Sequence, residues 1–149
     1  MTKKILIVED NIAIAENIFD FLELAGFTPC SIAKNYEEAV SQFEDHDPDL
    51  AILDVNLEGE RTGIDVAKFI RVSSNMPFIY YSAAVEPQLL EKAKTTKPFA
   101  FISKPIEFTN LKAAIDAALG NNFNNSILKM SILDRIAFHI APGLNAKGI

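Results

Sequence analysis

The sequence predicts an α/β fold, a (βα)5 doubly wound five-stranded parallel sheet followed by a C-terminal helical tail. Two observations predict it. Five short apolar runs, rich in β-branched and aromatic residues, alternate with segments in which apolar residues recur at helical spacing. Most of the runs are continuous rather than alternating, which is typical of strands covered by helices on both faces. A chain of 149 residues suits one domain of ordinary size.

The first two strands and helices follow from these patterns. Residues 5–8 form an apolar, β-branched run. After Asp10, a good N-cap residue, apolar side chains recur at helical spacing until Gly26, which supplies the stop. Residues 28–32 form the second predicted strand, and residues 36–43 form a second amphipathic helix that ends before an Asp-Pro break.

The third and fourth pairs repeat the alternation. Residues 50–53 are a continuous apolar run, and Gly63 opens a helix whose apolar face is formed by Val66, Ala67 and Ile70. Residues 78–81 form the fourth predicted strand, and Leu89, Leu90 and Ala93 mark a shorter helix after it.

The fifth pair completes the predicted body. Residues 99–102 form the last strand, and a helix over residues 108–118 begins near Glu107 or Thr109. Right-handed crossovers between parallel strands place the helices on both faces of the sheet. Ligands of such sheets bind outside the carboxyl ends of the strands, and this edge is where we expect a functional site.

Composition and charge exclude several classes of protein. The formal net charge of −6 disfavours nucleic acid as the main partner, because phosphate binding needs a basic face. The single cysteine, Cys30, cannot form an internal disulfide. No apolar run approaches the roughly 20 residues of a membrane span. We therefore expect a cytoplasmic protein that binds neither nucleic acid nor membrane directly.

The charge also divides the chain near residue 120. Residues 1–120 carry 11 basic and 19 acidic side chains, whereas residues 121–149 carry 3 and 1. The sequence predicts a domain over residues 1–120 and, over residues 121–149, an Asn-rich linker with a short amphipathic helix. This tail could pack on the domain, pair with a second copy or lead to a further domain. It is too short for a helix-turn-helix DNA-binding unit.

Polar residues gather at the predicted carboxyl ends of four strands. Glu9 and Asp10 follow the first strand, Asp54 the third, Ser82 the fourth and Lys104 the fifth. Two like charges about 4 Å apart repel by about 4 kcal/mol at an effective dielectric constant of about 20. Three converging carboxylates therefore need cations, which Lys104 and a hard divalent ion with oxygen ligands, Mg²⁺, would supply.

Other chemistry-bearing residues are explained more simply by packing. His46 and His139 have no partner at metal-ligand spacing, and Cys30 lies in a predicted buried strand. Tyr80 and Tyr81 are interpreted as strand residues. No glycine-rich phosphate loop follows the first strand, which argues against a dinucleotide-binding fold.

The motifs Glu9-Asp10, Asp54, Ser82-Ala83 and Lys104-Pro105 resemble those of the receiver domain of two-component response regulators. The resemblance covers residues 3 to about 119. It implies the flavodoxin-like strand order 2-1-3-4-5 and a phosphorelay signalling module rather than an enzyme. A sensor histidine kinase or phosphotransfer protein would donate a phosphoryl group to Asp54 in an Mg²⁺-dependent reaction, and a downstream protein would read the result.

The resemblance also implies a metal site. Asp10 would bind Mg²⁺ directly, Glu9 would help through water, and Asp54 would belong to the same metal site. Asn56, two residues after the acceptor, would offer its backbone carbonyl as a further ligand.

A switch is implied in the same way. Ser82 and Lys104 would contact the phosphoryl oxygens, and the Lys104-Pro105 bond would be cis. Phe101 matches the position of the aromatic switch residue, although it lacks the hydroxyl of a tyrosine. Its movement would alter the face between the fourth helix and the fifth strand, and either this face or the tail could form a homodimer.

The loop after the acceptor departs from the usual pattern of the family. Receivers often have a proline four residues after the acceptor and a glycine eight residues after it. Here position 58 is Glu, and Gly63 lies nine residues on, so the loop is one residue longer. We expect Gly59 to absorb the additional turn.

The sequence leaves two other functions open. The first is a small phosphohydrolase that uses Asp54 as its nucleophile. Haloacid-dehalogenase-type phosphatases carry Asp-x-Asp, and Asn56 here removes the general acid of that motif. The second is a phosphate-independent interaction domain, which the intact acidic pair, acceptor and lysine disfavour.

Overall fold

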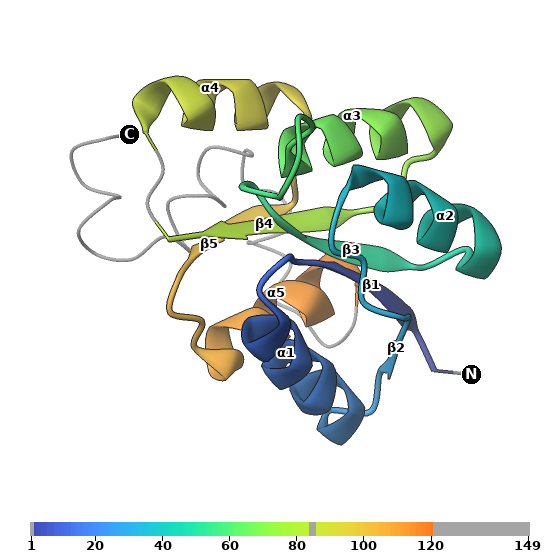
Figure 1. Cartoon of the computed structure of the whole chain (residues 1–149). Helices are drawn as coiled ribbons and strands as arrows, with labels where there is room; N and C mark the ends of the chain where they lie inside the picture. The colour runs from blue at the N-terminus through green and yellow to red at the C-terminus, as the bar shows by residue number, and fades with distance from the viewer. Residues whose placement is uncertain (1, 84–85, 121–149) are drawn as a thin grey trace.

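The computed structural model describes residues 2–83 and 86–120 and confirms the α/β fold predicted from the sequence. Five parallel strands form one sheet in the order β2-β1-β3-β4-β5, and helices cover both of its faces (Figure 1). The elements in chain order are β1 (Lys4–Val8), α1 (Ile12–Leu24), β2 (Thr28–Pro29), α2 (Tyr36–His46), β3 (Leu50–Asp54), α3 (Gly63–Ser73), β4 (Phe78–Ser82), α4 (Pro87–Thr95), β5 (Ala100–Ser103) and α5 (Phe108–Ala118).

Two hydrophobic clusters lie on opposite faces of the sheet. Alternate residues of each strand point to opposite faces, so Ile5 and Ile7 of β1 join one cluster while Leu6 and Val8 join the other. Helices α1 and α5 cover the first face, and α2, α3 and α4 cover the second (Figure 1). The central strands are buried on both faces, which explains their continuous apolar runs.

Strand β2 is shorter than predicted. The sequence predicts a strand over residues 28–32, but only Thr28 and Pro29 pair regularly with β1. The register then changes, because Ile5 is the partner of Pro29 whereas Val8 is the partner of Ala33. One extra residue is therefore inserted at this edge of the sheet, as in a β-bulge, and it ends the regular strand.

The start of α1 also differs from the prediction. Asn11, not Asp10, is the N-cap, and its side chain accepts a hydrogen bond from the N–H of Ile14 at 3.2 Å. An asparagine caps a helix as well as an aspartate does, so the sequence alone did not separate the two. The predicted stop is confirmed, since α1 ends at Leu24 and Gly26 has φ +92°.

The loop from β3 to α3 fixes a close approach between α3 and the end of β3. The side chain of Thr62 caps α3 and forms a capping box with Asp65. A Cβ atom on Gly63 would lie 1.8 Å from the carbonyl oxygen of Asp54, so only glycine fits there. Gly59, with φ +94°, adopts the left-handed conformation in the lengthened part of this loop.

The predicted tail, residues 121–149, lies outside the described residues. Within the described part of the chain, none of the helices combines the length and hydrophobicity needed to cross a bilayer.

Candidate functional site

The carboxyl ends of the strands bring the predicted polar residues to one edge of the sheet. Glu9 and Asp10 follow β1 directly, Asp54 and Ser82 are the last residues of β3 and β4, and Lys104 follows β5. In the register of the sheet, Val8 is the partner of Leu53, Asp54 of Tyr81, and Ser82 of Ser103. The strands thus end level with one another, and residues up to 95 positions apart in sequence become neighbours.

Lys104 lies between two buried carboxylates. Its Nζ atom is 3.0 Å from Oε1 of Glu9 and 3.1 Å from Oδ2 of Asp54. Glu9 is 0% exposed and Asp54 is 3% exposed. Buried carboxylates need compensating charge and hydrogen bonds, and Lys104 supplies both to each of them. Although burial alone lowers the pKa of Lys104, its hydrogen bonds to Glu9 and Asp54 raise the pKa overall.

Glu9 is the best satisfied of the acidic groups. Its Oε2 atom accepts the N–H of Asn11 at 3.0 Å, and its Oε1 atom accepts the hydroxyl of Tyr81 at 2.6 Å. Burial raises the pKa of Glu9, but its interactions with Asn11, Tyr81, Asp54 and Lys104 outweigh this effect and bring the pKa to about 2. Glu9 therefore remains ionised beside Asp54.

The other two carboxylates experience the negative charge of Glu9. Burial and the neighbouring Glu9 raise the pKa of Asp54 to about 7. Burial and Glu9 also raise the pKa of Asp10. One ammonium thus faces three carboxylates, and the site is short of positive charge.

The donor set fits a hard divalent cation. Glu9, Asp10 and Asp54 each offer a carboxylate oxygen, and these oxygens all lie within 4.8 Å of one another. Oxygen ligands of this kind suit Mg²⁺, which commonly uses one or two carboxylates together with water and phosphate oxygens.

Ser82 and Asn56 are also brought together. The side-chain amide of Asn56 donates to Oγ of Ser82 at 3.2 Å, and the N–H of Asn56 donates to Oδ1 of Asp54 at 3.1 Å. Ser82 is buried, and its hydroxyl meets the side chain of Asn56 rather than solvent. The peptide bond between Lys104 and Pro105 is cis.

Phe101 lies in the core rather than among the polar groups. It is fully buried in the cluster beneath α2, α3 and α4, and its ring centroid is 5.7 Å from that of Tyr80. The hydroxyl of Tyr80 shares a hydrogen bond of 2.6 Å with Oγ1 of Thr96, which immediately follows α4. Phe101 is thereby connected by packing to the end of α4.

Tyr81 belongs to the site, although the sequence pattern predicts only that it is a strand residue. Its backbone is in β4, its side chain is buried on the α1 and α5 face, and Nζ of Lys104 lies 4.9 Å from the centroid of its ring. One signal was available, because a buried tyrosine hydroxyl usually finds a hydrogen-bond partner. The sequence did not reveal that the partner is Glu9.

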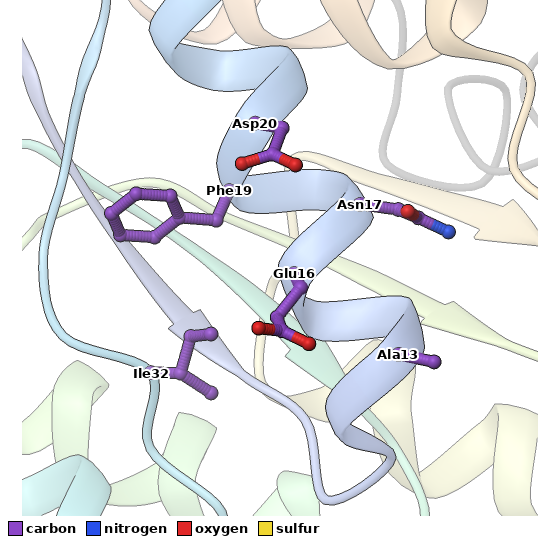
Figure 2. Close-up of a pocket in the computed structure, with 6 residues that line it drawn as sticks. All are labelled: Ala13, Glu16, Asn17, Phe19, Asp20 and Ile32. Carbon is purple, nitrogen blue, oxygen red and sulfur yellow. The ribbon is translucent and has the colours of Figure 1, made fainter.

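Two of the surface pockets in the described part of the chain are lined by several residues of α1. One pocket, of about 470 Å³, is mainly apolar and has Lys104 in its wall. It is lined by Ile14, Asn17, Ile18, Ala83, Lys104, Pro105, Ile106 and Phe108. The other, of about 560 Å³, lies along α1 (Figure 2). Figure 2 shows Glu16, Phe19 and Asp20 of α1 around it, with Ile32 opposite. Of these two pockets, only the first adjoins the acidic site.

Comparison with known proteins identifies relatives over most of the chain. The family model for the response regulator receiver domain matches residues 5–116. The transcriptional regulatory protein PdtaR of Mycobacterium tuberculosis is 32% identical over 117 residues, which cover 78% of this chain and 57% of that protein. The phosphate regulon transcriptional regulatory protein PhoB of Escherichia coli is 33% identical over 122 residues, which cover 80% of this chain and 52% of PhoB. The chain thus aligns with little more than half the length of these relatives.

Solved structures agree with the sequence comparison. The signal receiver domain of a modulated diguanylate cyclase from Desulfovibrio desulfuricans is 29% identical and superimposes with a TM-score of 0.76, covering 80% of this chain and 95% of that one. A CheY-like receiver domain from Methanospirillum hungatei gives the same TM-score at 24% identity, with the same coverage of both chains, and therefore supports the fold.

Proposed function

Because the chain belongs to the response regulator receiver domain family of two-component systems, we propose that Asp54 accepts a phosphoryl group from a histidine kinase or phosphotransfer protein. Receiver domains are signalling modules that interact with such donors and with downstream effectors. The observation that supports the acceptor role best is the position of Asp54 at the end of β3, buried and held by Lys104 at 3.1 Å.

The chemistry requires the site to offset charge. An oxygen of the Asp54 carboxylate attacks the phosphorus atom of the donor and forms a new P–O bond. The bond from phosphorus to the donor breaks, and its electron pair leaves with the donor group. Carboxylate and donor are both anionic, so Lys104 promotes the reaction by neutralising charge on the transferring oxygens. The chain turns over no separate substrate, apart from the loss of its own phosphoryl group to water.

The acidic residues would supply the metal site of this reaction. Asp10 and Asp54 would hold Mg²⁺ through their carboxylates, Glu9 would act through water, and Asn56 would contribute its backbone carbonyl. This assignment is supported by three carboxylates whose oxygens lie within 4.8 Å of one another, with one ammonium, that of Lys104, beside them. The ion, when bound, places two further positive charges next to the transferring phosphoryl group.

Modification would change the surroundings of Ser82. A phosphoryl group on Asp54 adds negative charge and acceptor oxygens, to which the hydroxyl of Ser82 would donate. Ser82 now accepts a hydrogen bond from Asn56, so its hydroxyl faces the loop that follows Asp54. Movement of Ser82 would leave room for Phe101, which packs on Tyr80, and would shift α4 and β5 toward a second arrangement.

The switch would act through protein contacts. The face formed by α4 and β5 and the tail over residues 121–149 are the candidate surfaces for a downstream protein or a second copy. The division into a domain over residues 1–120 and a tail, the cytoplasmic setting and the absence of direct contacts with DNA remain predictions from the sequence.

Intact mass measurement tests the proposal. The protein is incubated with acetyl phosphate and Mg²⁺, and the wild type should gain the mass of one phosphoryl group. Asp54→Asn, which keeps the shape of the side chain but removes the nucleophile, should gain none, and chelation of Mg²⁺ should abolish the gain in the wild type. An unmodified wild type would favour the phosphate-independent interaction domain. Steady multiple-turnover hydrolysis that Asp54→Asn abolishes would favour the phosphohydrolase.

A further inference from the structure

Tyr81 and Lys104 donate to the same oxygen of Glu9. The hydroxyl of Tyr81 lies 2.6 Å from Oε1, and Nζ of Lys104 lies 3.0 Å from it. Tyr81 is 1% exposed, so water does not readily replace its hydroxyl. The second oxygen of Glu9 accepts the N–H of Asn11. The carboxylate is therefore fixed at both oxygens, and Lys104 is not its only source of compensation.

We propose that Tyr81 is a positioning residue for phosphoryl transfer, whose hydroxyl satisfies Glu9 so that Lys104 stays shared with Asp54. The inference rests on the proposed function, because it assigns a part in the same reaction to a residue outside the acceptor, lysine and metal-binding set.

The position of the Lys104 ammonium between Glu9 and Asp54 depends on how well Glu9 is hydrogen-bonded. Nζ of Lys104 is almost equally far from Glu9 and from Asp54, at 3.0 and 3.1 Å. A buried carboxylate that lost the hydroxyl of Tyr81 would attract the ammonium more strongly, because a charged acceptor left short of donors is costly in a buried site. The ammonium would then move toward Glu9 and away from the oxygen of Asp54 and the phosphoryl group.

The backbone places Tyr81 well for this role. Tyr81 is the register partner of Asp54, and its carbonyl accepts the N–H of Val55 at 3.3 Å. The pairing of β4 with β3 therefore fixes the backbone of Tyr81 beside the backbone of Asp54. Nζ of Lys104 also lies 4.9 Å from the centroid of the Tyr81 ring. Replacement of Tyr81 by phenylalanine should therefore remove the hydroxyl and keep this cation–π contact.

Tyr81→Phe tests the proposal, and Tyr80→Phe is its matched control. Both tyrosines are buried in β4, and each substitution removes one side-chain hydrogen bond of 2.6 Å. The two differ in partner, because the hydroxyl of Tyr80 contacts Thr96 on the other face of the sheet. At saturating Mg²⁺, Tyr81→Phe should lower the second-order rate constant for phosphorylation by acetyl phosphate about tenfold. Tyr80→Phe should change it by less than about twofold, even though both variants lose thermal stability.

A double-mutant cycle with Glu9→Gln separates positioning from structure. A neutral amide does not draw the ammonium away from Asp54, so Tyr81→Phe should cost less than about twofold when Glu9 is already Gln. A purely structural role would give the same loss in both backgrounds. A wild-type rate constant in Tyr81→Phe, an equal loss in Tyr80→Phe, or the same loss with Gln at position 9 would each overturn the role of Tyr81.

Phosphorylation of the wild type separates failure of the proposed function from failure of the role assigned to Tyr81. If the wild type gains a phosphoryl group and Tyr81→Phe gains it at the same rate, the proposed function stands and only the role of Tyr81 is wrong. If the wild type gains none, the proposed function is wrong, and the role of Tyr81 in this reaction is wrong with it.

Discussion

Replacement of Gly63 by alanine should disturb the acceptor itself. An added Cβ atom would lie 1.8 Å from the carbonyl oxygen of Asp54 and 2.8 Å from its carbonyl carbon, whereas real Cβ atoms essentially never come within 3.0 Å of such atoms. Both neighbours are backbone and cannot rotate away, so α3 and the end of β3 must separate by about 1 Å or more. A displacement of about 1 Å at reacting groups can lower a rate about 100-fold.

The same clash should lower the stability of the domain. Extra volume forced into a well-packed site costs about 1–3 kcal/mol. The hydrogen bond of 2.9 Å from the N–H of Gly63 to the carbonyl of Val55 would be stretched as well. We expect Gly63→Ala to lose about 2–3 kcal/mol of unfolding free energy in urea and to take up phosphoryl groups from acetyl phosphate about 100-fold more slowly while folded.

Gly59→Ala is the control in the same loop. Gly59 has φ +94°, so an alanine there is strained by about 1–2 kcal/mol, but a Cβ atom would meet nothing within 4 Å. This variant should lose stability and keep its phosphorylation rate within about threefold. If Gly63→Ala phosphorylates as fast as Gly59→Ala, the close approach of α3 does not hold Asp54 in place, and the reasoning from the backbone contact is wrong.

Three further predictions concern stability. Arg71→Ala should lose about 2 kcal/mol in urea, because its guanidinium donates to three backbone carbonyls in the segments before β4 and β5, whereas Val72→Ala, at a position 90% exposed, should change little. Burial raises the pKa of Tyr80 above its usual value of about 10, so the unfolded chain loses the hydroxyl proton at a lower pH than the folded chain. The free energy of unfolding should therefore fall as the pH rises above about 10, and it should fall less steeply in Tyr80→Phe. Mg²⁺ should raise the melting temperature of the wild type in thermal scans, and Asp10→Asn should abolish most of this rise; an equal rise in Asp10→Asn would remove Asp10 from the metal site.

The sequence predicted most of the fold because hydrophobic patterning decides it. The five apolar runs lie at the five strands, and the helical stripes lie at the five helices. The predicted end of β2 was wrong because one inserted residue before Ala33 shifts the pairing register with β1 but leaves the apolar pattern of the sequence unchanged. The cap of α1 was wrong because Asp10 and Asn11 have equal capping propensity, and only the backbone geometry selects Asn11.

The site was predictable where it depends on strand ends and unpredictable where it depends on side-chain direction. The position after a parallel strand determines which edge a residue reaches, and this rule brought Glu9, Asp54 and Lys104 together. The hydrogen bond from Tyr81 to Glu9 depends on the register between β4 and its neighbours, which no local pattern encodes. The contact that requires Gly63 depends on the packing angle of α3, although the glycine itself was visible in the sequence.

The location of the phosphoryl group tests the central claim most directly. After incubation with acetyl phosphate and Mg²⁺, borohydride reduces an aspartyl phosphate to homoserine, and peptide mass mapping then finds the reduced residue. We expect reduction at position 54 and at no other carboxylate of the site. Reduction at Asp10 or Glu9, or an unreduced peptide from a protein that carries a phosphoryl group, would contradict it.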